Sequence, residues 1–410
     1  MRGGRRRACI AVAMIVCDTV SGLRDALDRI RNRTLREKRA ARDAAANANG
    51  TAAASEQTPV EPGSSVSVGL VATMGYLHDG HAALIAQSRH ENDVTVGTIF
   101  VNRKQFERDE DFELYPRDQE RDCVLFEVNG ADVVFAPHSH EELYPQGHET
   151  TISCQLLSKR SEGRNRPGHF DGVALIVAKL FILIQPQNAY FGAKDAQQCA
   201  IIKRMTTDLN FATRVRIVET VRDPSDGLAL SSRNAMLTSH ERKYANTLYR
   251  SLCAASARMR LSLLHLDNGR SLEFLRRPEG AKRVMYRILS DSLEASGCHT
   301  HIDDVSVVNQ DTFEVMDGHD TKFSCALILI AVYLGKARLI DNVRVDLESR
   351  DQQPSQTEAD VIAGFKIADG SEEEMSVLVD DYLVLTYGLA RQLREDQNRT
   401  KRQRLETTSS

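Results

Sequence analysis

The sequence predicts an α/β protein that consists of a doubly wound parallel sheet and a smaller C-terminal α+β domain. Between residues 66 and 221, short apolar runs alternate with stretches of helical periodicity. This alternation is typical of parallel strands connected by helices. After residue 234 the pattern changes to two long helical stretches and short apolar strands, which indicates a second domain.

Composition limits the class of protein. The chain has 410 residues, of which 41% are hydrophobic and 27% charged, and this leaves room for two or three domains. The formal net charge of -4 gives no whole-chain case for a nucleic-acid or membrane partner. No apolar run approaches the roughly 20 residues of a membrane span. Eight cysteines occur without a C-x-x-C pair, so we expect reduced thiols and a cytoplasmic protein.

The N-terminal region combines a basic leader, residues 1–13, with an apolar run at residues 8–17. Together they imitate a signal peptide, but the apolar run can equally form a first strand, and an organellar presequence stays open. Leu23, Ala26, Leu27 and Ile30 then recur at helical spacing, which favours a strand followed by an amphipathic helix. Residues 32–65 lose this periodicity and are predicted to form a flexible insertion.

The remaining elements follow in a regular order. Strands are expected at residues 66–71, 94–100, 132–136, 189–191 and 215–221, with helices from about 82 and at 117–128, 171–183 and 196–208. The C-terminal domain should contain helices at 241–258 and 279–295 and strands at 305–308 and 326–332. A linker and an amphipathic helix at 372–393 follow. The expected domains are therefore a leader at 1–13, the sheet domain at 14–222, the C-terminal domain at 223–346 and a helical, charged tail at 347–410.

The most informative stretch is residues 71–81, where a strand ends, a loop containing Gly75 turns, and a helix begins with His78 and His81. The unpaired N–H groups and the dipole of a helix N-terminus favour an anion. Gly75 and Gly80 allow the backbone to approach a ligand closely. A phosphate site is therefore predicted at the carboxyl end of this strand, where open α/β sheets bind ligands.

Two further polar loops follow predicted strands, namely residues 192–195 and residues 222–234. A lysine, two serines and an arginine from these loops, placed beside the histidines, would form a triphosphate clamp. Neither G-x-x-x-x-G-K-[ST] nor G-x-G-x-x-G occurs, so a nucleotide would be bound in another way. The run that starts at His140-Glu141 lacks the second histidine of a zinc protease, and no metal site is expected.

Several motifs in one order resemble the pantothenate synthetase family, also called pantoate–β-alanine ligases, of the HxGH nucleotidyltransferase superfamily. The similar stretch extends from about Met14 to Asp346. Its motifs are Thr73-Met74-Gly75-x-Leu77-His78-Asp79-Gly80-His81, Ile99-Phe100-Val101-Asn102 with Gln105-Phe106, Asp111-Phe112, Tyr115-Pro116-Arg117, Arg166-Pro167-Gly168-His169-Phe170-Asp171-Gly172-Val173, Lys194-Asp195-x-Gln197-Gln198, Asp226-Gly227-Leu228-Ala229-Leu230-Ser231-Ser232-Arg233-Asn234 and Arg338-Leu339-Ile340-Asp341-Asn342.

The resemblance implies a Rossmann-like fold, a homodimer and a two-step reaction. Pantoate would attack the α-phosphate of Mg·ATP to form pantoyl adenylate, and the β-alanine amine would then displace AMP. The implied catalytic residues are His78, His81 as the proton donor, Lys194 and Arg233. The implied ATP-binding residues are Met74, Gly75, His78, Gly80, His81, Gly192, Lys194, Asp195, Val221, Leu230, Ser231, Ser232 and Arg233; those for pantoate and β-alanine are Gln105, Gln198, Asn102 and Tyr115. Mg²⁺ would be bound mainly by phosphates and water, without protein ligands.

Three departures from the family pattern leave alternatives open. Arg103 replaces a usual proline and should loosen the loop that presents Gln105. Ala193 replaces a usual acidic or polar residue, and one extra residue lies between Arg222 and Asp226. One alternative is an adenylyl- or cytidylyltransferase for another acid or a phosphorylated alcohol, which Gln105 and Gln198 disfavour. A second is a non-catalytic regulatory protein that binds pantoate or a nucleotide, which the intact histidines disfavour.

Overall fold

The computed structural model describes residues 13–48, 65–263, 271–316, 323–348 and 371–387. The chain forms two compact units. The N-terminal unit consists of Met1–Cys154, Gly168–Ala193 and Ile201–Val221, and the C-terminal unit of Gln155–Pro167, Lys194–Ala200 and Arg222–Ser410. Residues 155–167 and 194–200 thus fall in the C-terminal unit, although sequence order placed them in the sheet domain. None of the helices in the described ranges has the length and apolar character needed to cross a membrane.

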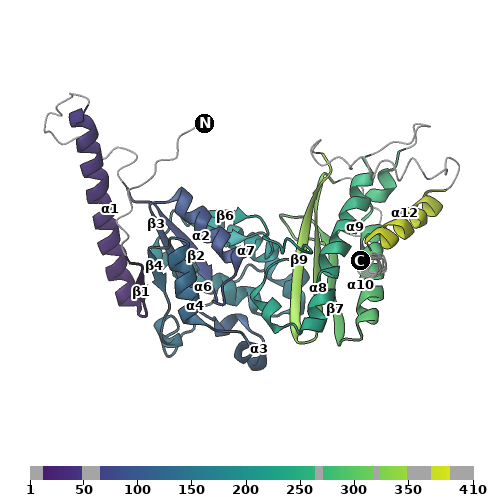
Figure 1. Ribbon diagram of the computed structural model, residues 1–410, viewed down its shortest axis with the longest axis horizontal. Coiled ribbons are helices and arrows are strands. Elements are labelled where there is room, and N and C mark those ends of the chain that lie inside the picture. The colour runs from purple at the N-terminus through teal and green to yellow at the C-terminus, as the bar shows by residue number, and fades with distance from the viewer. Residues whose placement is uncertain (1–12, 49–64, 264–270, 317–322, 349–370, 388–410) are drawn as a thin grey trace, which may run out of the picture. The chain divides into compact units, whose positions relative to one another are not determined.

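The N-terminal unit contains a six-stranded parallel sheet in the order β1-β4-β3-β2-β5-β6, which confirms the predicted doubly wound fold (Figure 1). The strands are β1 (Ile15–Cys17), β2 (Val68–Thr73), β3 (Val94–Ile99), β4 (Val133–Phe135), β5 (Asn188–Gly192) and β6 (Arg214–Val218). From β2 the chain proceeds to β3 and β4, whereas β5 returns to the other side of β2. The switch in strand order therefore lies between β2 and β5, where doubly wound sheets bind ligands.

Helices cover the sheet and place its loops. They are α1 (Val20–Ala48), α2 (Asp79–Glu91), α3 (Asp109–Glu113), α4 (Gln119–Val128), α6 (His169–Ile184) and α7 (Ala196–Asp208), with short turns η1 (Arg103–Gln105) and η2 (His140–Glu142). Helix α2 packs against β2 and β5. Val71, Leu77, Ile85 and Phe126 share one buried cluster, so the loop between β2 and α2 is anchored in the core by Leu77.

Helix α1 corrects the prediction of a flexible insertion at residues 32–65. The helix continues to Ala48 (Figure 1). Lys38 on this helix forms an ion pair with Asp93. Arg31 donates from Nη2 to the Ile184 carbonyl at 2.7 Å. Residues 35–48 are rich in Ala, Arg, Glu and Lys, which are strong helix formers, so the helix persists without an apolar stripe. Residues 49–64 and the predicted leader up to residue 12 lie outside the described residues.

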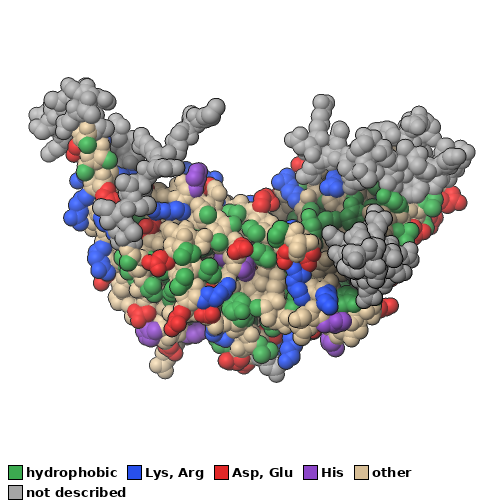
Figure 2. All heavy atoms as spheres, viewed as in Figure 1, with side chains coloured by type: hydrophobic (Ala, Val, Ile, Leu, Met, Phe, Trp, Pro, Cys, Tyr) green, Lys and Arg blue, Asp and Glu red, His purple; other side chains and the backbone are tan. Residues whose placement is uncertain are grey.

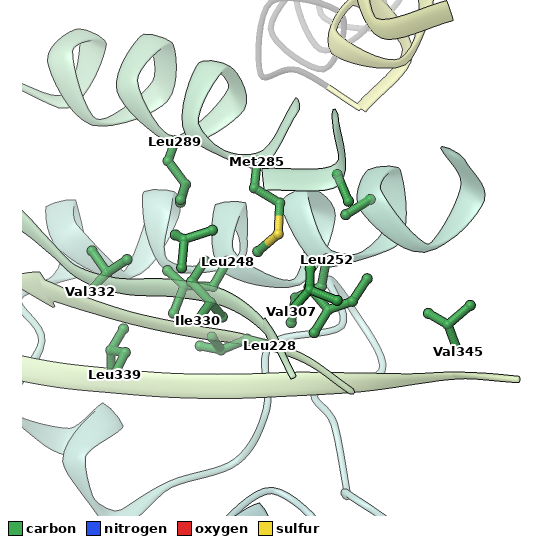
Figure 3. Close-up of a cluster of buried hydrophobic side chains, with 14 of the residues drawn as sticks. Leu228, Leu248, Leu252, Met285, Leu289, Val307, Ile330, Val332, Leu339 and Val345 are labelled. Atoms are coloured by element: carbon green, nitrogen blue, oxygen red, sulfur yellow. The ribbon is translucent and has the colours of Figure 1, made fainter. Parts of the chain in front are cut away.

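The C-terminal unit is an antiparallel sheet, β7-β8-β9, covered by helices. Its elements are η3 (Leu157–Lys159), α5 (Ser161–Asn165), η4 (Ser232–Met236), α8 (Ser239–Ala245), α9 (Thr247–Leu261), η5 (Glu273–Arg276), α10 (Pro278–Ser296), β7 (Thr300–Val308), β8 (Cys325–Leu334) and β9 (Ala337–Asp346). Figure 3 shows Leu252 of α9 and Met285 of α10 near Val307 of β7 in its core. The sequence did not predict β9 as a strand, because Arg338, Asp341 and Asn342 interrupt its apolar pattern.

The helix predicted in the tail is α12 (Glu372–Tyr387), and it belongs to the core of the C-terminal unit. Its Met375, Val379 and Leu383 are buried in one cluster with Leu275 and Ile288. The prediction of a separate charged tail is therefore wrong for this helix. A pattern of apolar residues predicts a helix, but it does not reveal which surface the helix covers.

A buried ion pair holds α12 against α9 and α10. Arg258 of α9 is 1% exposed, and it donates to Asp380 Oδ1 at 2.7 Å and to Ser376 Oγ at 2.7 Å. Arg283 of α10 donates from Nε to the other Asp380 oxygen at 2.8 Å. Asp380 thus joins three helices through one carboxylate.

Replacing Asp380 by alanine should destabilise the C-terminal unit strongly, because Arg258 would stay buried without its partner. We expect a loss of about 3–5 kcal/mol in the free energy of unfolding. Urea unfolding followed by circular dichroism measures it, since the chain contains no tryptophan. The matched control is Asp381→Ala, whose pair with Arg287 is exposed and should contribute less than about 1 kcal/mol. Equal effects of the two substitutions would contradict a special role for the buried pair.

Candidate active site

The loop between β2 and α2 has the backbone shape that its glycine permits. Gly75 has φ +86° and the next residue, Tyr76, has φ +50°. A Cβ atom at position 75 would lie 2.9 Å from Asp122 Oδ2 and 3.2 Å from Ile99 Cγ2. A side chain at position 75 is thus disfavoured both by the backbone and by the lack of space. The strand, glycine loop and helix start that the sequence predicted are all present.

Asp122 of α4 holds this loop in place. Its Oδ2 accepts from the Tyr76 N–H at 2.6 Å, and its Oδ1 accepts from the Leu77 N–H at 2.7 Å. The side chain is buried, and this burial raises the pKa of the Asp122 carboxyl while the two backbone donors oppose the rise. Asp122 was not among the site residues predicted from the sequence. The signal that could have identified it is an acidic residue four positions before the buried Phe126, on the apolar face of a helix.

The two histidines cap the N-terminus of α2, as their position predicted. His78 is the N-cap residue, and its Nδ1 accepts from the Gly80 N–H at 3.1 Å. His81 reaches back, so that its Nδ1 accepts from the His78 N–H at 3.3 Å. The ring centroids are 4.2 Å apart. Because both Nδ1 atoms accept, the neutral rings carry their proton on Nε2, and each ring can donate that N–H to an anionic oxygen.

A group of amide side chains follows β3, the neighbour of β2. Asn102 donates from Nδ2 to Gln105 Oε1 at 3.1 Å and to the Gly172 carbonyl of α6 at 3.0 Å. The Gln105 Nε2 contacts the sulfur of Met74. Thioether sulfur is a weak acceptor, so this amide can donate to a stronger acceptor of a ligand. Tyr144 donates to Asn102 Oδ1 at 2.9 Å, and burial raises the pKa of this tyrosine.

Arg103 and Tyr115 stabilise the same loop. Arg103 donates from Nη1 to the Phe106 carbonyl at 2.8 Å and forms an ion pair with Asp109. Arg103 therefore stabilises the turn that presents Gln105, although its replacement of a proline predicted a looser loop. The physical reason is that an arginine side chain can bridge backbone and carboxylate groups. Tyr115 is buried beside Phe106, with ring centroids 5.8 Å apart.

The other candidate residues lie in the C-terminal unit. The Lys194 ammonium is 3.5 Å from Asp195, and the Lys194 carbonyl accepts from Asn342 Nδ2 at 2.8 Å. Gln197 is buried and donates to the Leu157 and Arg160 carbonyls, whereas its neighbour Gln198 is partly exposed. Of the two adjacent glutamines, Gln198 is the more exposed.

Ser231, Ser232 and Arg233 start the short helix η4. Ser231 is its N-cap, and its Oγ accepts from the Arg233 N–H at 3.2 Å. Arg166, which pairs with Glu162 at 3.0 Å, belongs to the same group of charges. Burial lowers the pKa of Arg166, and the positive charges of Arg233 and Arg338 lower it further. An anion beside these arginines would relieve their mutual repulsion.

The sequence-predicted site residues thus fall into two sets, one in each unit. The N-terminal unit contains Met74, Gly75, His78, Gly80, His81, Asn102, Gln105, Tyr115, Gly192 and Val221; the C-terminal unit contains Lys194, Asp195, Gln198, Leu230, Ser231, Ser232 and Arg233. Within the first set, register places the carboxyl ends of β2 and β5 side by side, so the histidine loop and Gly192 share one edge of the sheet. The clamp of both sets around one ligand stays a prediction.

The described residues show neither a cluster of metal ligands nor, on the face in Figure 2, a large surface of one charge. Among the described residues, no group of three or more His, Cys, Asp or Glu side chains is arranged to bind a metal ion. On the face shown in Figure 2, acidic, basic and apolar side chains are interspersed. Basic residues that could bind a phosphate are therefore local groups, such as Arg166 with Arg233.

The fold and the site in the N-terminal unit indicate the class of protein. A doubly wound sheet with a capped helix N-terminus at its switch point is an arrangement that binds anionic ligands such as nucleotide phosphates. The chain belongs to the pantoate–β-alanine ligase family, whose family model matches residues 45–344. It is 44% identical over 280 residues to a pantothenate synthetase of Caldicellulosiruptor bescii, covering 68% of this chain and 92% of that protein. A Dehalococcoides mccartyi pantothenate synthetase is 46% identical over 276 residues, covering 67% and 95%.

Solved structures of the same family are similar to this chain. The pantothenate synthetase of Thermus thermophilus has a TM-score of 0.61 and 38% identity, covering 80% of this chain and 99% of that one. The pantoate–β-alanine ligase of Francisella tularensis, complexed with beta-gamma ATP and β-alanine, has a TM-score of 0.57 and 29% identity, covering 84% and 100%. Helix α12 lies beyond the residues that match the family model.

Replacing Asp122 by asparagine should slow ligation with a moderate loss of stability. The amide NH₂ would face one of the two backbone N–H groups, at a cost of about 1–3 kcal/mol. The resulting shift of the histidine loop should lower kcat by about tenfold or more. Steady-state kinetics and thermal unfolding measure both effects.

The matched control for this prediction is Asp132→Asn. Asp132 also accepts a backbone N–H, that of Thr95 at 2.8 Å, and it pairs with Arg89 in the last turn of α2, at the other end of the helix from the histidines. We expect this variant to lose stability while kcat stays near that of the unmodified protein. A fully active Asp122→Asn variant would show that the loop keeps its position without the carboxylate.

Proposed function

We propose that this protein joins pantoate to β-alanine in two steps at the expense of ATP. The pantoate carboxylate attacks the α-phosphate, which yields pantoyl adenylate and pyrophosphate. The amine of β-alanine then attacks the acyl carbon of the adenylate, and AMP leaves. The observation that carries the proposal is the pair of capping histidines at the switch point, in a chain of the pantoate–β-alanine ligase family. The ligands of the Francisella tularensis structure support the same substrates.

The histidines suit the first step. In-line attack on phosphorus increases negative charge on the α-phosphate oxygens and on the leaving pyrophosphate. The Nε2–H groups of His78 and His81 are donors fixed in orientation by their caps, and the α2 dipole adds a partial positive charge. Preorganised donors of this kind stabilise the transition state without having to reorient. Lys194, Ser231, Ser232 and Arg233 would bind the remaining phosphate oxygens.

The amide group after β3 suits pantoate, which carries one carboxylate and two hydroxyls. Gln105 and Asn102 offer both donors and acceptors without adding charge. We assign Gln105, with Gln198, to the hydroxyl and carboxylate oxygens of pantoate. Asn102 and Tyr115 stabilise the turn around this subsite, through the bond to Gln105 and through the packing on Phe106.

The proposal includes Mg²⁺ as a companion of ATP, a homodimer and a cytoplasmic location. The described residues offer no carboxylate cluster, so Mg²⁺ would arrive with ATP and keep phosphate and water ligands. The homodimer rests on the family resemblance. A cytoplasmic location is supported by the seven described cysteines, all of which are free thiols.

Pyrophosphate exchange into ATP tests the two-step reaction with Mg²⁺ and one acid at a time. An enzyme that forms an acyl adenylate before the amine reacts catalyses this exchange with the acid alone. We expect exchange with pantoate, none with β-alanine alone, and AMP as the nucleotide product when both are present. Exchange with a different acid would point to another nucleotidyltransferase. Its absence with every acid, in protein that binds ATP, would point to the non-catalytic alternative.

Replacing His81 by glutamine separates catalysis from capping. Glutamine at the third helical position completes a capping box, so the start of α2 should stay intact, but the Nε2–H donor is lost. We expect kcat to fall by about 100-fold or more, the effect typical of one preorganised donor. The melting temperature should change little. His90→Ala, at an exposed position in the last turn of the same helix, is the control. Unfolding of His81→Gln, with no specific loss of rate, would refute the catalytic role.

A further inference from the structure

Strand β9, an edge strand of the C-terminal sheet, carries two adjacent polar residues, Asp341 and Asn342, halfway along its length. Both are buried, with exposed fractions of 3% and 9%. Adjacent residues of a strand point to opposite faces of the sheet. Asp341 therefore lies on the face of Leu339 and Val345, which belong to the helix-covered core, and Asn342 lies on the other face. Two buried polar residues at the centre of a strand need a specific explanation.

Asp341 binds the start of the loop that leads to η4. Arg222 donates to its two oxygens from Nη1 at 2.6 Å and from Nη2 at 2.9 Å, which is a bidentate pair. The Arg222 guanidinium also lies 4.0 Å from the ring centroid of Tyr249 on α9. Two groups, the Asp341 carboxylate and the Tyr249 ring, thus determine the position of Arg222.

The loop after Arg222 is closed on itself. Arg222 forms an isolated antiparallel bridge with Ala229, and its Nη1 donates to the Gly227 carbonyl at 3.2 Å. Gly227 has φ +79°, and a Cβ atom there would lie 2.3 Å from Tyr249 Cδ1, so no other residue fits. The Ala229 carbonyl accepts from Asn234 at 3.1 Å. A displacement of Arg222 would consequently be transmitted to residues 231–233.

Asn342, on the opposite face of β9, contacts Lys194, which is another candidate phosphate-binding residue. Its Nδ2 donates to the Lys194 carbonyl at 2.8 Å, while its backbone N–H donates to Asp341 Oδ1 at 2.8 Å. Lys194, Gln197 and Asn342 line one small cavity, and Gln197 Oε1 has no hydrogen-bond partner among the described residues. The Lys194 backbone therefore depends on Asn342 for one of its fixed contacts beside this cavity.

We propose that Asp341 and Asn342 are positioning residues for the ATP phosphates. One strand thereby fixes the spacing between Lys194 on one face and the segment with Ser231, Ser232 and Arg233 on the other. The inference rests on the proposed function, because it assigns the phosphates to these side chains. Strand β9 is paired with β8 along its whole length and is a rigid support, and groups held on rigid elements are placed more accurately than groups on loops.

The principal test is Asn342→Ala, which removes the bond to the Lys194 carbonyl and leaves the Lys194 side chain intact. We expect the KM for ATP to rise about tenfold, as for the loss of one buried hydrogen bond. The KM for pantoate should rise much less than the KM for ATP, because Gln105 does not depend on β9 and only Gln198 of the two assigned glutamines lies on the segment after Lys194. Equal changes in the two KM values, or an unchanged KM for ATP, would overturn the proposal.

The matched control is Asn129→Ala. Asn129 ends α4 and also donates from Nδ2 to a backbone carbonyl, that of Leu125, at 2.8 Å. The substitution removes the same kind of bond without touching Lys194, so the KM for ATP should stay unchanged. A rise equal to that in Asn342→Ala would show that general loosening of the fold explains the effect, and would overturn the proposal.

A double-mutant cycle tests whether Asn342 acts through Lys194. In a Lys194→Ala background, Asn342→Ala should raise the KM for ATP by less than about twofold, because the side chain that it positions is gone. Full additivity of the two substitutions would overturn the positioning role.

The substitution Arg222→Lys tests the role of Asp341, because lysine keeps the positive charge beside Asp341 but cannot form the bidentate pair. This variant should also raise the KM for ATP selectively. An unchanged KM for ATP in this variant would remove Asp341 from the proposal.

Failure of this inference and failure of the proposed function give different results. Pyrophosphate exchange by the unmodified protein is measured first, and its absence with pantoate counts against the proposed function alone. ATP binding by calorimetry then replaces the KM for ATP, and the same ratios between variants decide whether Asp341 and Asn342 position Lys194 and residues 231–233.

Discussion

The need to satisfy the first N–H groups of α2 is the constraint on which the candidate site depends. In most helices serine, threonine or aspartate fills this role, and here two histidines do so through Nδ1. The cap determines the tautomer of both rings and leaves Nε2–H as the group available to a ligand. The same backbone positions carry the positive end of the helix dipole, so structural capping and anion binding use one arrangement.

Buried carboxylates set the geometry around this cap and in the C-terminal unit. Asp122 accepts two consecutive backbone N–H groups, Asp341 accepts both arms of Arg222, and Asp380 joins Arg258 to Arg283. Each would be costly to bury without these partners. Because a carboxylate has two acceptor atoms, each can join two donors, and an alternative arrangement would leave at least one charge unpaired. These carboxylates therefore determine the positions of their partner groups more than they increase the free energy of unfolding.

Two helices extend beyond the region that matches the family model. The first turns of α1 precede the matched residues 45–344, and α12 follows them. Neither segment contains a candidate substrate residue. Helix α12 covers apolar side chains of η5 and α10, and it does so with a fully buried ion pair. A helix held in this way is part of the hydrophobic core.

The sequence by itself determined the doubly wound sheet, the position of the histidines at the start of α2 and the family. These features rest on local periodicity and on the spacing of motifs, which need no knowledge of distant contacts. It also identified the helix of the tail, because the apolar residues of α12 recur locally. It failed for residues 32–48, where helix propensity without an apolar face resembles a flexible segment.

Only the tertiary structure decided the rest, because the decisive contacts join residues far apart in the chain. Asp122 meets Leu77 across 45 positions, Arg222 meets Asp341 across 119, and Arg258 meets Asp380 across 122. Strand β9 was missed for the same reason: Asp341 and Asn342 look like loop residues until their partners are known. Residues 155–167 and 194–200 join the C-terminal unit through contacts such as Arg338 with Glu162 and Asn342 with Lys194. Periodicity reports which face of an element is apolar, but the partner of a buried polar group is a property of the folded chain.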